Sequence, residues 1–315
     1  MNKLFKAASI IVEACSNSIY WFFRDLKYGA FTKNREDLLN RLLVAGHVLE
    51  KGITMPNRRL GFGQDVVKVV IELCNKCISK YGNDIPQLQF AINDLEEYLM
   101  VHKENNYELP GNITDGIQKL LSYGNKELIP SKEYTKETFF CGYKDFKDFA
   151  CQRHSVRFFS NENVPEDLLR KVMELATSAP SACNRQSIRV KVLSGEKKEQ
   201  VLQLQNGNRG FGHFVNKLLV VTSEQTAWDY CYRTSAYLDG GIFTMNLLYS
   251  LHYYKICACT LNAHLSRKRI NKLREIAKMK KSEIPIVFIA IGMPAESFKI
   301  ASSRRLDAQE IVSFI

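Results

Sequence analysis

Two short stretches decide the fold of this chain: Arg153-His154-Ser155-Val156-Arg157 and, one predicted helix later, Ala179-Pro180-Ser181-Ala182-Cys183-Asn184-Arg185-Gln186. In an extended segment alternate side chains point the same way, so Arg153, Ser155 and Arg157 can converge on one phosphate group. Guanidinium groups match phosphate oxygens bidentately. A solvated basic loop has the same composition, and the short motif taken alone favours that simpler interpretation.

The second stretch follows a helix that we predict to start at Pro165, with Glu166 and Asp167 in its first turn. This helix ends at Ala179-Pro180, and a strand is predicted over 188–193. Between them lies a polar loop whose amide side chains suit the mixed donor and acceptor edge of a flavin ring. An ordinary turn would use the same residue types, so the loop indicates a flavin site only in combination with the first stretch.

In this order, the two stretches resemble the FMN-binding signature of the nitroreductase family, and the resemblance covers about the last 170 residues. The segments similar to the family's central helix, its next strand and its C-terminal tail are Asp239-Gly240-Gly241, Asn246-Leu247-Leu248, Lys255 to Cys259, Ile291 to Pro294 and Arg304-Arg305. Two segments depart from the pattern. Ser187-Ile188 replace a proline and an aromatic residue, and Tyr253-Tyr254-Lys255-Ile256 replace a glycine-rich stretch.

The resemblance implies an α+β fold with a mixed, mainly antiparallel sheet and surrounding helices. It implies FMN as the cofactor, NAD(P)H as the electron donor, and an extensive homodimer with two FMN sites between subunits. It also implies chemistry at flavin N5 with no catalytic side chain. The residues expected at FMN are Arg153, His154, Ser155, Arg157, Pro180, Ser181, Asn184, Gln186, Ile256, Cys257, Ala258, Arg304 and Arg305. One of Arg304 and Arg305 is expected to bind the phosphate.

Apolar patterns predict the other elements of this C-terminal part. Further strands are expected over 218–222, 255–260 and 285–291. The helix over 238–251 is apolar on nearly all sides and must therefore be buried, which the resemblance attributes to the dimer core. Gly240 and Gly241 would permit a close backbone approach there.

Residues 1–140 are predicted to form a helical region of unknown role, and residues 141–315 the FMN-binding domain. Apolar periodicity places four helices, around Leu38–Leu49, Val66–Cys77, Leu88–Leu99 and Ile113–Leu120. The simpler interpretation of the stretch from His47 to Gly63 is a helix that ends at Gly52 and is followed by a glycine-rich turn. The alternative is that His47, Arg58 and Arg59 line a site, such as a lid over the flavin.

Composition limits the compartment and the partners. None of the apolar runs in its 315 residues approaches the roughly 20 residues needed to span a bilayer, so we expect no membrane partner. The apolar run Ala7–Val12 is cut short by Glu13, so we expect no secretory signal. Nine scattered cysteines indicate reduced thiols in a cytoplasm, with Cys74-x-x-Cys77 as buried core thiols and no metal site.

Charge is concentrated in the C-terminal part. Residues 146–315 contain 25 basic and 15 acidic residues, against 19 and 18 in residues 1–145. The densest basic run, 267–281, is expected to be a solvated helix face or to steer an anionic small molecule; we expect no nucleic-acid partner.

Three functional classes remain open from the sequence. The leading one is an FMN-dependent oxidoreductase that passes electrons from NAD(P)H to a nitro compound, a quinone or another small organic acceptor. The second is a specialised biosynthetic FMN enzyme acting on an anionic metabolite. The third is a flavin-binding or partner-binding protein without turnover.

Overall fold

The computed structural model describes residues 3–24, 33–124, 129–228 and 233–315 and divides into two compact units. The helical unit comprises residues 1–132 and 301–315, and the sheet unit comprises residues 133–300. This division differs from the expected domains, 1–140 and 141–315, because the tail after residue 300 belongs to the helical unit. Hydrogen bonds from Ser302, Ser303 and Arg304 to that unit's helices account for the difference.

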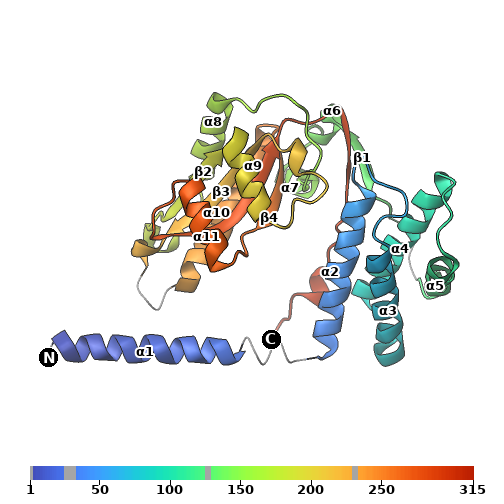
Figure 1. Cartoon of the computed structure of the whole chain (residues 1–315), viewed down its shortest axis with the longest axis horizontal. Coiled ribbons are helices and arrows are strands. Elements are labelled where there is room, and N and C mark those ends of the chain that lie inside the picture. The colour runs from blue at the N-terminus through green and yellow to red at the C-terminus, as the bar shows by residue number, and fades with distance from the viewer. Residues whose placement is uncertain (1–2, 25–32, 125–128, 229–232) are drawn as a thin grey trace. The chain divides into compact units, whose positions relative to one another are not determined.

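The helical unit is built from amphipathic helices, and the four predicted ones are all present (Figure 1). Asn34 begins the first of them by accepting a hydrogen bond from the Asp37 amide. Their apolar faces share one core that includes Cys74 and Cys77, which confirms the prediction of buried thiols. The helices of this unit are α1 (Lys3–Arg24), α2 (Arg35–Ile53), α3 (Gln64–Tyr81), α4 (Pro86–Glu104) and α5 (Gly111–Leu121).

The sheet unit contains a four-stranded antiparallel sheet in the order β2-β3-β5-β4. The strands are β2 (Ile188–Leu193), β3 (Lys217–Glu224), β4 (Cys257–Asn262) and β5 (Glu283–Gly292). Each lies where a strand was predicted, within a few residues. A separate two-stranded sheet pairs β1 (Lys132–Thr135) with β6 (Ser297–Ile300). The expected α+β class, with an antiparallel sheet and a preceding helical region, is confirmed.

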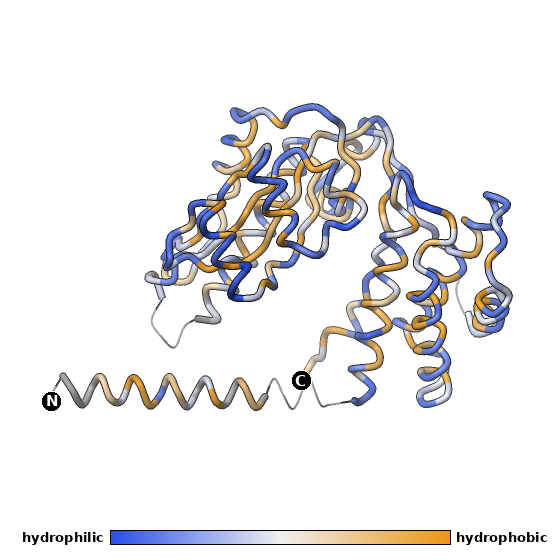
Figure 2. The backbone as a smooth tube through the Cα atoms, in the orientation of Figure 1, coloured by the Kyte–Doolittle hydropathy of each residue, from blue (hydrophilic) through white to orange (hydrophobic). Residues whose placement is uncertain are grey.

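Helices cover both faces of the four-stranded sheet (Figures 1 and 2). On one face, Leu219 and Ile289 pack with α8 (Glu166–Ala176) and α10 (Arg233–Tyr253) in a single core. Because strand side chains alternate, Leu218 and Phe288 point to the opposite face, and both are fully buried. There α9 (Gly195–Leu204) contacts β3 and α11 (Arg267–Ile276) contacts α9.

The central helix α10 is buried on one side only. Gly240 lies against β5, where a Cβ atom would come within 2.7 Å of Ile286. The close approach expected of Gly240 is therefore made within one chain, whereas Gly241 faces open space. On the outward side α10 exposes large apolar side chains, which are Tyr237, Leu238, Ile242, Met245 and Tyr253. An exposed apolar face of this size marks an interaction surface.

Several shorter elements and one long helix escaped the sequence prediction. The short helices are α6 (Lys136–Phe139) and α7 (Phe146–Gln152), and the long one is α1. Of the cysteines, Cys231 lies outside the described residues. Within the part of the chain that the structure describes, none of the helices has the length and apolarity needed to cross a bilayer.

Candidate functional site

The segment Arg153–Arg157 is extended and runs beside the edge strand β4. Helix α7 ends at Gln152, and Arg153 begins the extended backbone with φ −66° and ψ 112°. The Val156 amide donates a 3.0 Å hydrogen bond to the Ala258 carbonyl, and the Val156 side chain is fully buried. Ser155 and Arg157, the two neighbours of Val156, are half-exposed. The structure therefore brings this segment to Ala258, the second residue of β4.

A cluster of aromatic rings lies next to Arg153 and His154. His252, near the end of α10, packs against Phe140 and Phe149, and its Nε2 lies 2.8 Å from the Tyr143 hydroxyl. Burial, followed by the positive charges of Arg153 and His154, lowers the pKa of His252 to about 4. His252 is therefore neutral at physiological pH and adds no charge beside Arg153.

The predicted amide loop has an unusual backbone. Cys183, Asn184 and Gln186 adopt positive φ angles of 51°, 54° and 48°, which side chains with a Cβ seldom adopt. The Gln186 side-chain amide donates to Asn184 Oδ1 at 2.9 Å, and the Gln186 backbone amide donates to Ser181 Oγ at 3.0 Å. Such strain concentrates at ligand sites, where the surrounding structure holds it in place. The two amide side chains are thus presented together and exposed, beside the half-exposed Ser181 and the exposed Pro180.

Asp239 anchors this loop, and the sequence analysis gave it no role. Its two carboxylate oxygens accept hydrogen bonds of 3.2 and 3.0 Å from the Ala182 amide, and the residue is almost fully buried in α10. Arg185 adds a second tie through a 3.0 Å bond from Nε to the Ala227 carbonyl. The sequence feature that could have identified Asp239 is its position as a carboxylate in an apolar helix, because a buried acid requires hydrogen-bond partners.

The two departures from the family pattern have local explanations. Ser187 is buried, and its hydroxyl lies 3.0 Å from the Ser223 hydroxyl, so it fastens the loop to β3. Lys255 occupies a left-handed position, φ 58°, just after α10. The bonds Lys255 N–H to His252 O (3.0 Å) and Ile256 N–H to Leu251 O (2.9 Å) form the helix-ending motif in which glycine is preferred.

Within one chain, the two predicted parts of the site lie at diagonally opposite corners of the sheet. The amide loop enters β2 at Ile188, and β2 is one edge strand. Arg153–Arg157 lies beside the start of β4, the other edge, where Cys257 pairs with Gly292 at the far end of β5. Three strand spacings and the length of β5 separate the corners by roughly 30 Å.

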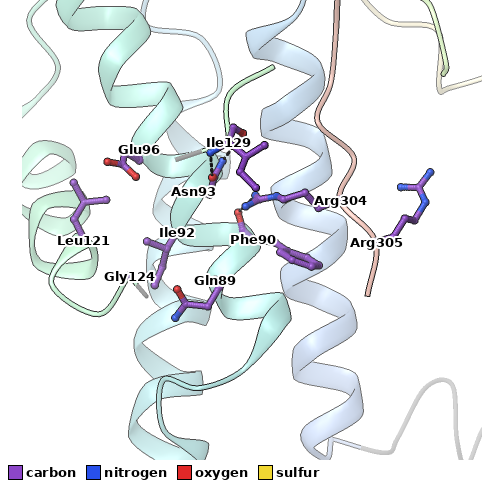
Figure 3. A pocket seen from close by; sticks show the side chains of 10 residues that line it. All are labelled: Gln89, Phe90, Ile92, Asn93, Glu96, Leu121, Gly124, Ile129, Arg304 and Arg305. Atoms are coloured by element: carbon purple, nitrogen blue, oxygen red, sulfur yellow. Dashed lines mark hydrogen bonds between the residues drawn. The ribbon is translucent and has the colours of Figure 1, made fainter. Parts of the chain in front are cut away.

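The two C-terminal arginines lie in the helical unit. Arg304 Nη2 donates to Asp94 Oδ1 at 2.9 Å and to the Phe90 carbonyl at 2.6 Å. Both arginines line a cavity of about 290 Å³ that also includes Asn93, which exchanges hydrogen bonds with Ile129 (Figure 3). Arg304 is thus engaged by Asp94, whereas Arg305 is exposed and donates to the Ser303 carbonyl. A phosphate role for either stays a prediction.

The stretch from His47 to Gly63 ends α2, although not at the expected residue. The helix passes through Gly52 to Ile53, and a Cβ at Gly52 would come within 2.2 Å of the Phe62 ring. Glycine is therefore required for packing rather than for capping. His47 Nδ1 lies 3.1 Å from Glu50, Arg58 donates to the Ile53 carbonyl at 3.0 Å, and Arg59 is exposed. These contacts favour a structural role for the stretch.

Comparison with protein-family models identifies one family. Residues 150–208 match the model of the nitroreductase family. The matched segment contains both stretches quoted first, so the resemblance predicted from the sequence is confirmed there. No curated protein matches the chain.

Solved structures similar to this chain include three bacterial proteins. A provisionally named nitroreductase from Desulfovibrio desulfuricans in complex with FMN is 19% identical, with a TM-score of 0.48, and covers 54% of this chain and 96% of that chain. A provisionally named NAD(P)H:FMN oxidoreductase from Staphylococcus epidermidis is 18% identical, with a TM-score of 0.48, covering 56% and 98%. A nitroreductase family protein from Streptococcus pneumoniae is 19% identical, with a TM-score of 0.46, covering 54% and 100%.

Proposed function

We propose that this chain is an FMN-dependent oxidoreductase that passes electrons from NAD(P)H to a small organic acceptor. The observation that carries the proposal is the extended Arg153–Arg157 segment, fixed beside β4 with the half-exposed Ser155 and Arg157 flanking the buried Val156 in the chain. The match of residues 150–208 to the nitroreductase family supports it. The flavin would supply the hydride chemistry, and the protein would supply binding, orientation and electrostatics.

The residues present fit the cofactor. Arg153, Ser155 and Arg157 would hold the phosphate through charge-assisted hydrogen bonds, beside an uncharged His252. Asn184 and Gln186 are hydrogen-bonded to each other through Gln186 Nε2 and Asn184 Oδ1. Asn184 Nδ2 would then donate to the ribityl chain or the ring edge, and Gln186 Oε1 would accept from it. Asp239 keeps the loop that carries them in its strained conformation.

We also propose that each FMN site is assembled from two copies of the chain. The two sets of residues lie roughly 30 Å apart in one chain by strand geometry, a longer span than an extended FMN molecule. A dimer can bring the β4 corner of one copy to the β2 corner of the other. The exposed apolar face of α10 offers a surface for such an association, because it is too large to be left in water without a function.

The basic charge of the sheet unit favours a second candidate. The exposed side chains of α11 and the following turn are predominantly Lys and Arg, at positions 267, 268, 269, 272, 278, 280 and 281. This surface would attract an anionic acceptor and so suits a biosynthetic FMN enzyme acting on an anionic metabolite. The same charge would equally attract the phosphates of NAD(P)H, so the surface does not select the acceptor.

The proposal is tested with purified protein and FMN. We expect one FMN bound per chain, a yellow protein whose mass by light scattering is that of a dimer, and oxidation of NAD(P)H when a quinone or nitro compound is added. A colourless monomer at saturating FMN would contradict both the cofactor and the assembly. Tight FMN binding without NAD(P)H oxidation would instead support a flavin-binding protein without turnover.

A further inference from the structure

Helix α1 carries an exposed apolar face that the flavin chemistry does not use. Five large side chains on this helix are between 57% and 68% exposed, and they are Ile11, Val12, Ile19, Phe22 and Phe23. Figure 2 shows hydrophobic residues recurring along the helix. A single exposed leucine or valine requires no explanation, but a continuous apolar face does.

The spacing of these residues makes α1 amphipathic. Ala8, Ile11, Cys15, Ile19 and Phe22 recur three or four residues apart and so form one stripe along the helix. Val12 and Phe23 widen this stripe on one side. Ser9, Glu13 and Ser16 lie outside this stripe, with Ser16 at its border beside Phe23 and Glu13 opposite its middle. The apolar face is therefore wider than the narrow seam through which two helices form a coiled coil.

We propose that α1 binds the surface of an anionic lipid bilayer, with its apolar face in the interfacial region. Its sequence contains Lys3, Lys6 and Arg24 against the single acid Glu13, so the helix is complementary to anionic headgroups. It also contains the run Tyr20-Trp21-Phe22-Phe23, residue types that are enriched at the boundary between lipid and water. A helix with one apolar and one polar face lies in the plane of the interface.

This proposal revises our expectation that the protein has no membrane partner. That expectation rested on the lack of an apolar run of roughly 20 residues, and the N-terminal run Ala7–Val12 is cut short by Glu13. In the folded helix Glu13 lies opposite the middle of the stripe, so it interrupts the linear run without interrupting the apolar face. A linear search for apolar runs does not detect such a helix.

The test is co-sedimentation of the full chain with vesicles of phosphatidylcholine alone and of phosphatidylcholine containing about one third phosphatidylglycerol. We expect binding to the anionic vesicles. The double variant Ile11→Asp, Ile19→Asp should lower that binding by about tenfold or more. The matched control Ser9→Asp, Ser16→Asp introduces the same charge outside the stripe and should retain more of the binding than the first double variant.

Three results would overturn the proposal. One is wild-type protein that stays in the supernatant with anionic vesicles. Another is an equal loss of binding in the two double variants, since that would show a dependence on charge alone. The third is an apolar-face variant that still sediments with vesicles but forms a smaller assembly by light scattering, which would assign the face to a second copy of the chain. Equal thermal unfolding of all three proteins shows that the variants remain folded.

Discussion

The two units place similar polar residues in opposite situations. In the helical unit, Glu50, Asp94 and Arg304 are largely buried. Arg304 forms an ion pair with Asp94, and Ser302 Oγ and the Ser303 amide both donate hydrogen bonds to Glu50. In the sheet unit, Asn184 and Gln186 are exposed on a backbone with positive φ angles. The first arrangement is closed by the chain's own tail, and the second is open to a ligand. Burial, rather than residue type, distinguishes the two clusters, and backbone strain does not, since Ser303 in the closed cluster also has a positive φ of 40°.

The largest expected effect sharpens the open side of this comparison. Arg153→Ala should weaken FMN binding by about 1.5 to 3 kcal/mol, or roughly one to two decades, because a charge-assisted phosphate contact is lost. Arg170→Ala removes the same charge from the exposed surface of α8 and is the control. Flavin fluorescence titration measures both. Equal affinities for the two variants would remove Arg153 from the site.

A second variant tests whether the strained loop depends on its anchor. Asp239→Ala removes both acceptors of the Ala182 amide, so we expect FMN binding to weaken by about tenfold as the loop relaxes. Asp239→Asn keeps one oxygen that can accept this hydrogen bond and should lose less affinity. If the alanine variant binds FMN like the wild type, while its thermal unfolding is also unchanged, the anchoring role is wrong.

The closed side of the comparison predicts a pH dependence. Burial, and then the Glu50 carboxylate, raise the pKa of Asp94 to about 8, and Arg304 acts in the opposite direction. Between about pH 5 and pH 8 the folded unit thus holds a proton on Asp94 that the unfolded chain has released, so the contribution of Asp94 to stability falls as pH rises, by at most about 1.4 kcal/mol per pH unit. Glu50, whose pKa is lowered, contributes the opposite slope only at more acidic pH.

Burial lowers the pKa of His102 on α4, so this histidine contributes the opposite slope below about pH 6.5. Hydrogen exchange of the α4 amides between about pH 7 and 8, corrected for intrinsic rates, measures the Asp94 slope above that range. Asp94→Asn cannot titrate and should flatten it. A slope that is unchanged in this variant, or a wild type that gains stability as pH rises, would refute the assignment to Asp94.

The smallest expected effect concerns strain that serves no ligand. Lys255 ends α10 at a φ of 58°, so Lys255→Gly should stabilise the sheet unit by about 0.5 to 1 kcal/mol, seen as a rise in Tm of a few degrees. Lys255→Ala retains the Cβ atom and should give no gain. A loss of stability in the glycine variant would show that the lysine side chain contributes more than its backbone costs.

The sequence predicted what depends on local pattern. The four strands and the helices around Leu42, Val70, Leu95 and Ile117 follow from apolar periodicity, and the family resemblance follows from two motifs close together in the chain. It could not place the tail after residue 300, because the Arg304–Asp94 contact joins residues more than 200 positions apart. It missed Asp239 for the same reason, since the partner amide at Ala182 is remote in sequence.

The central claim, that each FMN site is assembled from two copies, is tested most directly by mixing two variants that each bind FMN weakly. Arg153→Ala disables the β4 corner, and Asn184→Ala disables the β2 corner. If a site joins corners from different copies, each mixed dimer has one intact site and one doubly altered site. After subunits exchange in an equal mixture, we predict that about a quarter of all sites bind FMN with wild-type affinity. No recovery of tight sites, in a mixture shown to contain mixed dimers, would contradict the claim.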